Sequence, residues 1–349
     1  MVSFCILDNY MSITLVISLN AIVSASIHPE LKLINVVFRH GDRTPSNDGD
    51  ESFPTDPYVN DSFFPTGVGQ LTNHGKKREY DLGQALRARY KDFLGGLYLP
   101  KLVVAHSSDY DRTKMSLQLV LAALFSSTDH RQRWNTDLNW QPIPMTYISR
   151  IDDNFYTGFN CPKYLDEYDR ILNLPEIKKG MSRFKDIMSK LTELTGPMIR
   201  AILNNMITGK NPIPSNTKLY LYSGHETNIA AILHAFKLYK PHVPEYSSAV
   251  ILELLEQNKQ NYVKFLYYRG IPSIFDELQI PGCEMLCPFD KFSYLIHDLI
   301  PSDEDIVCDK RQTPKYANME YPITLESKTY NLIKKNIDLI KKKRNSNNA

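Results

Sequence analysis

Short, almost continuously apolar runs alternate with longer segments of helical period over much of the chain. The short runs are rich in Leu, Val, Ile and Tyr, as in strands buried on both faces, and they lie at residues 31–38, 102–105 and 219–222. Each is followed by a segment with helical spacing of apolar residues, at 72–93, 112–125 and 226–238. This alternation predicts an α/β fold, a doubly wound and mainly parallel sheet with helices on both faces.

The pattern of apolar and polar residues is different in the middle of the chain. Residues 135–213 contain two helical patterns, at 161–173 and 182–207, and no convincing strand. We therefore expect an inserted all-helical cap domain there, with residues 26–134 and 214–345 forming the α/β core. The later elements expected are a strand pair at 249–255 and 262–268 and helices at 288–300 and 325–343.

The N-terminal segment has the pattern of an export signal. Residues 11–25 are apolar and uncharged, and they end in Val23-Ser24-Ala25, a small-residue cleavage pattern. The run is too short to span a bilayer comfortably. We expect residues 1–25 to be a signal peptide and the protein to be secreted or to reside in the lysosomal lumen. The alternatives are a translation start at Met11 and a buried N-terminal strand.

Charge excludes one class of partner. The chain has 41 Lys and Arg against 39 Asp and Glu, a net charge of +2. Residues 334–344 hold six basic residues and one acidic residue, so the remainder has a slight acidic excess. Outside residues 334–344 the chain lacks the basic excess that is typical of nucleic-acid-binding proteins. No segment is suited to be a stable membrane span.

Cysteine usage suits an oxidising compartment. The five cysteines are Cys5, Cys161, Cys283, Cys287 and Cys308. Cys5 leaves with the signal, and the other four allow three pairings. The close spacing favours a Cys283–Cys287 bridge, which leaves Cys161–Cys308. A zinc site is the alternative, but no His-rich or Cys-rich spacing completes one, so we expect no metal. The sequence Asn60-Asp61-Ser62 makes Asn60 an acceptor for glycosylation.

Charged turns that contain histidine follow the three predicted strands. They are Arg39 to Pro45, His106 to Thr113 and Ser223 to Asn228. Open α/β sheets place their sites at the carboxyl ends of strands, so these turns are expected to meet in one pocket. Two arginines on one turn can bind phosphoryl oxygens, a histidine between them can act as a nucleophile, and a carboxyl group opposite can protonate a leaving oxygen.

The first turn resembles a known signature. Arg39-His40-Gly41-Asp42-Arg43-Thr44-Pro45 is similar to the Arg-His-Gly-x-Arg-x-Pro pattern of the histidine acid phosphatases. This branch includes prostatic and lysosomal acid phosphatases and insect venom acid phosphatase-like proteins. Similar blocks recur at 71–75, 109–113, 140–144 and 283–308. The resemblance covers residues 31–308.

The resemblance implies a secreted acid phosphatase that hydrolyses small phosphate monoesters without a cofactor. His40 would attack phosphorus and form a phosphohistidine, while Arg39 and Arg43 would bind the phosphate. The family's later His-Asp pair falls on His225, expected at the phosphate, and Glu226, the expected proton donor. Family members are often dimers, so a homodimer is the oligomer to test for.

Two positions depart from the family pattern. Glu226 keeps the carboxyl group of the family's aspartate but adds a methylene. The family's remaining phosphate-binding arginine falls on His106, which we expect to help only when it is protonated, at about pH 5. We interpret Asp111 and Arg112 as a structural ion pair at a helix start, with direct contact to the substrate as the alternative. The alternative function is a weakened or inactive secreted member of the same fold, acting as a binding or venom-type protein.

Overall fold

The computed structural model describes most of the predicted core. The described residues are 28–46, 55, 57–58, 60–126, 129–150, 152–157, 185–210 and 216–303. Four expectations lie outside them: the signal peptide, the helix at 161–173, the Cys161–Cys308 bridge and the helix at 325–343.

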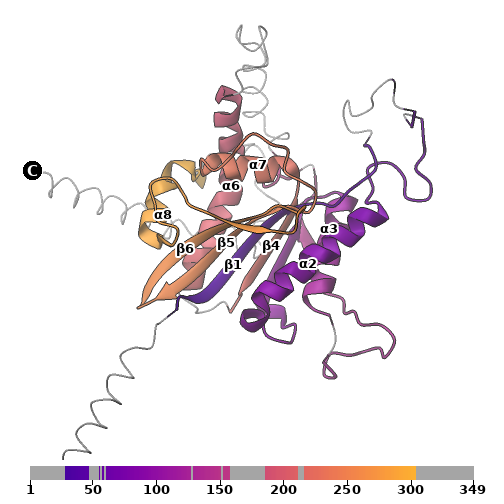
Figure 1. Cartoon of the computed structure of the whole chain (residues 1–349), viewed down its shortest axis with the longest axis horizontal. Coiled ribbons are helices and arrows are strands. Elements are labelled where there is room, and N and C mark those ends of the chain that lie inside the picture. The colour runs from indigo at the N-terminus through magenta and orange to yellow at the C-terminus, as the bar shows by residue number, and fades with distance from the viewer. Residues whose placement is uncertain are drawn as a thin grey trace, which may run out of the picture.

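One mixed sheet forms the centre of the described chain (Figure 1). Its strands are β1 (Glu30–Arg39), β2 (Val103–Ser107), β3 (Thr146–Tyr147), β4 (Leu219–Gly224), β5 (Ala249–Gln257), β6 (Gln260–Tyr268), β7 (Phe275–Leu278) and β8 (Cys287–Pro288). They lie in the order β3-β2-β4-β1-β5-β6-β7, and β8 pairs with β6. The strands β3, β2, β4 and β1 pair in parallel, whereas β5 to β8 pair as an antiparallel meander. The parallel part predicted from the sequence is the part that carries the histidine-bearing turns.

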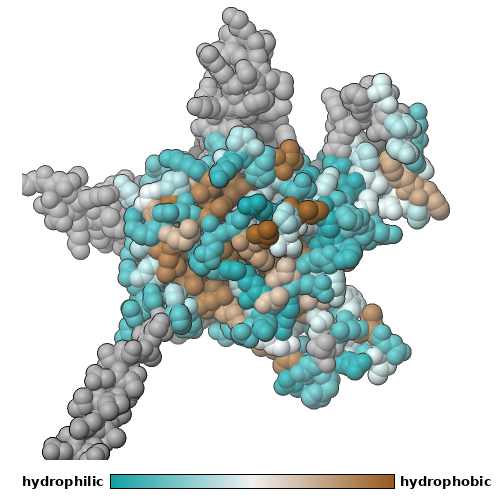
Figure 2. All heavy atoms as spheres, in the orientation of Figure 1, coloured by the Kyte–Doolittle hydropathy of each residue, from teal (hydrophilic) through white to brown (hydrophobic). Residues whose placement is uncertain are grey.

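Helices cover both faces of this sheet (Figure 1). One face carries α2 (Asn73–Leu94) and α3 (Asp111–Leu124), and the other carries α6 (Lys185–Lys210), α7 (Glu226–Ala235) and α8 (Phe289–Leu295). Two short 3₁₀ turns, Pro100–Leu102 and His297–Leu299, complete the described helical elements. In Figure 2 the side of the molecule with α2 and α3 is largely hydrophilic, as expected of amphipathic helices with charged outer faces.

The central strand β1 shows why its sequence is nearly all apolar. Leu33 and Val37 belong to the core on the α6 and α7 face, whereas Ile34, Val36 and Phe38 belong to the core under α2 and α3. Side chains alternate between the two faces of a strand. Because both faces are covered, the strand is apolar at nearly every position rather than at every second one. The exception is Asn35, which is buried and accepts a hydrogen bond from Asn205 Nδ2 at 2.7 Å.

The segment between 135 and 213 corrects one expectation. Thr146 and Tyr147 form β3, paired with His106 and Ser107 at the edge of the sheet, where no strand was predicted. A two-residue strand is too short to show a period. The second half of α6 lies in the sheet core, with Met198 and other apolar side chains buried there, and so belongs with the α/β unit. Residues 158–184 lie outside the described part, and the all-helical cap stays a prediction.

The described part of the chain contains one disulfide, which joins Cys283 to Cys287 beside β8. Asn60 is exposed. None of the helices within the described residues is long and apolar enough to cross a membrane.

The first turn of α2 supports the loop that follows β1. Thr72 caps the helix, and its hydroxyl accepts a hydrogen bond from Gly75 N at 3.0 Å. Gly75 then lies directly against the loop: a Cβ placed on it would be 2.1 Å from the carbonyl oxygen of Asp42. Gly41 approaches from the other side, where a Cβ would be 2.5 Å from the carbonyl oxygen of Gly75. Backbone meets backbone here, so neither residue can carry a side chain without moving the loop.

We expect Gly75→Ala to lower the free energy of unfolding by about 2–3 kcal/mol, because the added methyl group overlaps the backbone of Asp42. Helix propensity alone would favour alanine by about 1 kcal/mol, so any loss reports the close approach. Urea unfolding measures it. Gly96→Ala is the matched control, since a Cβ at Gly96 has open space around it. Equal stability of the two variants would contradict the packing described.

Candidate active site

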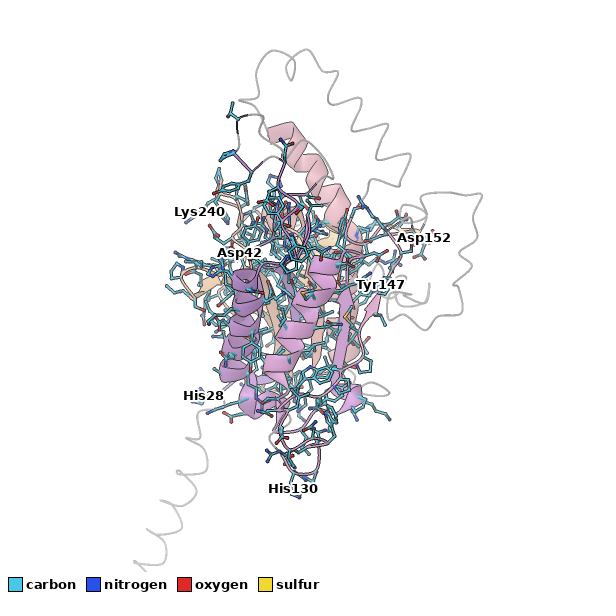
Figure 3. The ribbon with its side chains drawn as sticks, turned by 90° about the vertical axis from the view of Figure 1, so that its right-hand side faces the viewer. His28, Asp42, His130, Tyr147, Asp152 and Lys240 are labelled. Carbon is cyan, nitrogen blue, oxygen red and sulfur yellow. A yellow bond between two sulfur atoms is a disulfide. The ribbon has the colours of Figure 1, made fainter. Side chains whose placement is uncertain are left out.

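The three histidine-bearing turns meet at one end of the sheet. The pairing of β1 with β4 places Arg39 opposite Gly224, and the pairing of β2 with β4 places Ser107 opposite Ser223. Hydrogen bonds join the turns, from His40 N to Gly224 O at 3.1 Å and from Ser108 N to Ser223 O at 3.0 Å. In Figure 3 Asp42, which follows β1, lies well above His28 and His130, which are near the lower end of the molecule.

His40 lies at the centre of this end and is only 1% exposed. Its Nδ1 is 2.8 Å from the carbonyl oxygen of Gly41. A carbonyl oxygen only accepts hydrogen bonds, so Nδ1 carries the proton and Nε2 keeps its lone pair. Burial, and after it the neighbouring His225, lower the pKa of His40 well below its usual value. The ring is therefore neutral and is held with one nitrogen ready to act as a nucleophile.

His225 faces His40 edge-on, with ring centroids 5.6 Å apart. Its Nε2 is 3.0 Å from the hydroxyl of Ser108, which donates its own hydrogen to Thr113 Oγ1. The hydroxyl of Thr113 donates in turn to backbone carbonyls. It follows that His225 donates from Nε2 to Ser108. Burial lowers the pKa of His225 to about 3, and the charge of Arg112 is the second cause.

Arg39 is held in place on three sides. Its Nη1 donates to the carbonyl oxygen of Pro244 at 2.6 Å, its guanidinium lies 3.8 Å from the ring centroid of Tyr246, and its Nε is 3.0 Å from Glu226 Oε2. The planar group is therefore fixed before any ligand arrives. Arg43 lies in the loop that follows β1 and is half-buried, and its Nη1 donates to Thr44 O at 3.0 Å.

Glu226 is the first residue of α7, next to His225. Its side chain is 37% exposed, in contrast to the 9% of its partner Arg39. The carboxylate of Glu226 is therefore accessible to solvent, whereas the guanidinium of Arg39 beside it is buried. The structure brings together five of the residues predicted for the site, namely Arg39, His40, Arg43, His225 and Glu226.

His106 is placed differently from the sequence expectation. Its ring is stacked on Tyr156 at 5.5 Å, and its Nδ1 is 3.1 Å from the Tyr156 hydroxyl. That hydroxyl donates to the backbone carbonyl of His106 at 2.9 Å, so Nδ1 is the donor to it. Burial lowers the pKa of His106 to about 4. Burial thus opposes the cationic ring expected at pH 5, because the charged form would lose its hydration at this position, and the contact of His106 with phosphate stays a prediction.

The same contacts give His106 a supporting position. The backbone carbonyl of Tyr156 accepts a hydrogen bond from Asn228 Nδ2 at 2.9 Å, and Asn228 Oδ1 accepts from His225 N at 2.9 Å. His106 thus stabilises the tyrosine that holds the start of α7. A sequence comparison position by position could not reveal this, because the partner lies 50 residues away along the chain.

Arg112 enters the site instead. Its guanidinium lies 4.2 Å from the ring centroid of Tyr110, and that ring contacts His225 edge-on at 5.0 Å. The positive charge of Arg112 lowers the pKa of both His40 and His225. Of the two interpretations of Arg112, this position favours the one in which the residue acts on the site. In the sequence, the position of Arg112 close behind the charged turn that follows β2, as the second residue of α3, was the indication of this role.

A family model described as histidine phosphatase superfamily (branch 2) matches residues 30–211 and 191–268. The chain belongs to this family. A venom acid phosphatase of Apis mellifera is 42% identical, with 87% of this chain and 94% of that protein aligned. Prostatic acid phosphatase of Homo sapiens is 30% identical, with 80% of this chain and 88% of that protein aligned. The family resemblance read from the motifs is thereby confirmed.

Solved structures agree on the fold. A Klebsiella phytase superposes with a TM-score of 0.56 at 14% identity, over 80% of this chain and 98% of that chain. At this identity the likeness concerns the architecture alone. Within the described residues of this histidine phosphatase, no group of three or more His, Cys, Asp or Glu side chains could hold a metal ion.

A buried carboxyl group that the sequence analysis missed lies beneath the loop that follows β1 in this phosphatase. Glu79 of α2 is fully buried, and a Cβ on Gly41 would be 3.1 Å from its Cγ. Its Oε1 accepts a hydrogen bond from Ser247 Oγ at 2.7 Å. Burial raises the pKa of Glu79 to about 8. The group is therefore protonated in acid and becomes costly as the pH rises.

This predicts a chain that is more stable in acid. Unfolded, the carboxyl group of Glu79 ionises near 4.5, but in the folded chain it stays protonated up to about 8. The stability that it contributes is complete below about pH 4.5 and falls as the pH rises toward 8, by about 3–5 kcal/mol. We expect Glu79→Gln to remove most of this loss, measured as the difference in unfolding free energy between about pH 5 and pH 8.

Glu30→Gln is the matched control, because Glu30 has the same chemistry in an exposed side chain. A pH dependence in Glu79→Gln as steep as in the native chain would show that other groups cause it.

Proposed function

We propose that this chain is a secreted acid phosphatase that hydrolyses small phosphate monoesters through a covalent phosphohistidine on His40. One observation carries the proposal: a buried, neutral His40 has Nδ1 engaged with Gly41 O and Nε2 unprotonated, beside the fixed guanidinium of Arg39. Membership of the histidine phosphatase superfamily supports it, as do relatives named acid phosphatase.

In the proposed reaction the lone pair on His40 Nε2 attacks phosphorus, and the bond from phosphorus to the ester oxygen breaks. Arg39, Arg43 and Arg112 offset the negative charge of the phosphoryl group. Glu226, protonated, gives its proton to the leaving oxygen, and the alcohol departs. A water molecule then attacks the phosphohistidine, gives a proton to the Glu226 carboxylate, and releases phosphate with His40 restored.

Arg112 also bears on the alternative of a weakened binding protein. That alternative rested on the loss of a phosphate-binding arginine at His106 and on the longer side chain of Glu226. Arg112 lies 4.2 Å from the ring centroid of Tyr110, and that ring contacts His225, so a third cation lies near the site histidines without His106. This geometry favours the enzyme over the binding protein.

We expect His40→Ala to lower kcat by at least about 1,000-fold toward a chromogenic phosphomonoester at about pH 5, because no other group replaces the nucleophile. Acid quenching during turnover should trap phosphate on a histidine of the native chain and not of the variant. His74→Ala is the control, a histidine exposed on α2. Turnover in His40→Ala close to that of the control would reject the covalent mechanism.

The role of Glu226 predicts a dependence on the leaving group. We expect Glu226→Gln to slow alkyl phosphates by about 100- to 10,000-fold, because their alkoxides need a proton. The loss should be much smaller with 4-nitrophenyl phosphate, whose leaving group is stable as an anion. Comparing kcat for the two substrates measures this. Equal losses would mean that Glu226 acts only by positioning Arg39.

We also propose export through a cleaved signal peptide at residues 1–25, with sugar attached at Asn60. The apolar segment at 11–25 supports the first, and the exposure of Asn60 within Asn60-Asp61-Ser62 supports the second. Relatives named for venom and for the lysosome agree with an extracellular or lysosomal destination.

A further inference from the structure

The segment that leads into β5, residues 244–248, lies against the end of β1. Arg39 N donates to Ser248 O at 2.9 Å, and Ser247 N donates to His40 O at 3.4 Å. Pro244 O accepts from Arg39 Nη1 at 2.6 Å. This segment, the β5 entry loop, therefore contacts the two residues that are proposed to bind the phosphate and to attack it.

Tyr246, in the middle of the β5 entry loop, contacts both of their side chains. Its ring centroid lies 3.8 Å from Cζ of Arg39 and 5.7 Å from the centroid of the His40 ring. Tyr246 is half-buried, whereas Arg39 is only 7% exposed. The Tyr246 hydroxyl has no hydrogen-bond partner among the described residues, so the contact with Arg39 depends on the ring alone. A ring of this kind attracts a cation over its face.

The contacts of Arg39 leave one end of its guanidinium unoccupied. Nη1 donates to Pro244 O, and Nε is 3.0 Å from Glu226 Oε2. Nη2 has no partner in the part of the chain that the structure describes. The N–H groups of a guanidinium lie in its plane, so a ring against its face blocks none of them. The plane of Arg39 is thus fixed while Nη2 stays able to donate to a phosphoryl oxygen.

The β5 entry loop is itself held from the side of α2. Arg78 Nη2 donates to Tyr246 O at 3.1 Å, and Arg78 Nη1 donates to both carboxylate oxygens of Asp42 at 2.9 Å. The Ser247 hydroxyl donates to the buried carboxyl group of Glu79. The loop that carries the tyrosine ring is therefore tied to the loop after β1 before any ligand arrives.

Without the ring, Arg39 would be held less firmly. The hydrogen bond to Pro244 O fixes one nitrogen, and the ion pair with Glu226 involves a carboxylate that is 37% exposed. An ion pair with an accessible partner contributes little to holding a long side chain in one geometry. A phosphate group that bound to this arginine would then have to order the side chain, and that cost reduces its affinity.

We propose that Tyr246 is a positioning residue, which holds the guanidinium of Arg39 in the plane in which Nη2 binds the phosphate group. The ring acts through Arg39 and takes no part in the bond changes at His40. This inference rests on the proposed phosphatase function and adds to it the residue that prepares the site for its anion.

The test measures the binding of inorganic phosphate by calorimetry at about pH 5, together with kcat/KM for a chromogenic phosphomonoester. Tyr246→Leu should raise the Kd for phosphate by about 3- to 10-fold, the cost of ordering one long side chain on binding, and lower kcat/KM to a similar extent. Tyr246→Met, which is flexible and fills the space differently, should do the same. Tyr246→Phe keeps the ring and should stay within about twofold of the native chain.

Phe93→Leu is the matched control. Phe93 is a half-buried ring under another cation, with Lys218 Nζ 4.8 Å from its centroid. Lys218 precedes the first residue of β4, whereas the site lies at the last residue, Gly224. This variant removes a ring with a similar contact at the opposite end of the sheet, and it should leave the Kd for phosphate and kcat/KM unchanged.

A double-mutant cycle with Arg39→Gln separates positioning from packing. If Tyr246 acts through the guanidinium, Tyr246→Leu should change the Kd for phosphate by less than about twofold once Arg39 is replaced. The inference is overturned if the loss is as large in the Arg39→Gln background as in the native chain. It is also overturned if Tyr246→Phe loses as much as Tyr246→Leu, or if Phe93→Leu does.

The binding measurement also separates this inference from the proposed function. Inorganic phosphate is not consumed, so its Kd reports the state of Arg39 whether or not His40 forms a phosphohistidine. Failure to trap a phosphohistidine would reject the covalent mechanism and leave the cycle between Tyr246 and Arg39 as it is. An unchanged Kd in Tyr246→Leu would overturn the positioning role even in an enzyme that proceeds through His40.

Discussion

The hydrogen bond between His40 Nδ1 and the carbonyl oxygen of Gly41 decides what this site can do. It puts the proton on Nδ1 and leaves the lone pair on Nε2, as the proposed role of His40 as nucleophile requires. The bond exists because the loop after β1 is held against α2, where Gly41 and Gly75 meet backbone to backbone. A capped first helical turn, two glycines and the buried Glu79 therefore all act on the orientation of one imidazole ring. The packing of the loop against α2 thus fixes the carbonyl oxygen of Gly41, and this oxygen determines which nitrogen of His40 carries the proton.

The cations around the two histidines follow from the same arrangement. Burial and the arginine charges lower the pKa of both His40 and His225, so the rings stay neutral beside a phosphate site. An imidazole that became cationic would lose its nucleophilic lone pair. In the proposed reaction the arginines thus have two effects, since they would attract the phosphate and keep the nucleophile unprotonated. The protonated Glu79 beneath the loop adds a reason for such a protein to work in acid.

His106 and Arg112 show how a fold can redistribute roles among neighbouring residues. His106 lies on β2 and turns to Tyr156, where it supports the start of α7, whereas Arg112 lies on α3 and reaches the histidines through Tyr110. The guanidinium of Arg150 lies over the same tyrosine ring.

Sequence alone determined the elements whose residues interact locally: the apolar β1 run, the Thr72 cap, the helices α2 and α3, and the turn from Arg39 to Pro45. Strand and helix periods depend on neighbours a few residues apart, so they can be read from the chain. The direction of β5, the two-residue β3, the partner of His106 and the place of Arg112 needed the tertiary structure. Burial and charge interactions depend on distances in space between residues far apart in sequence. The pKa of a histidine in the charged turns, and with it the role of that residue, was therefore decided only when the sheet brought those turns together.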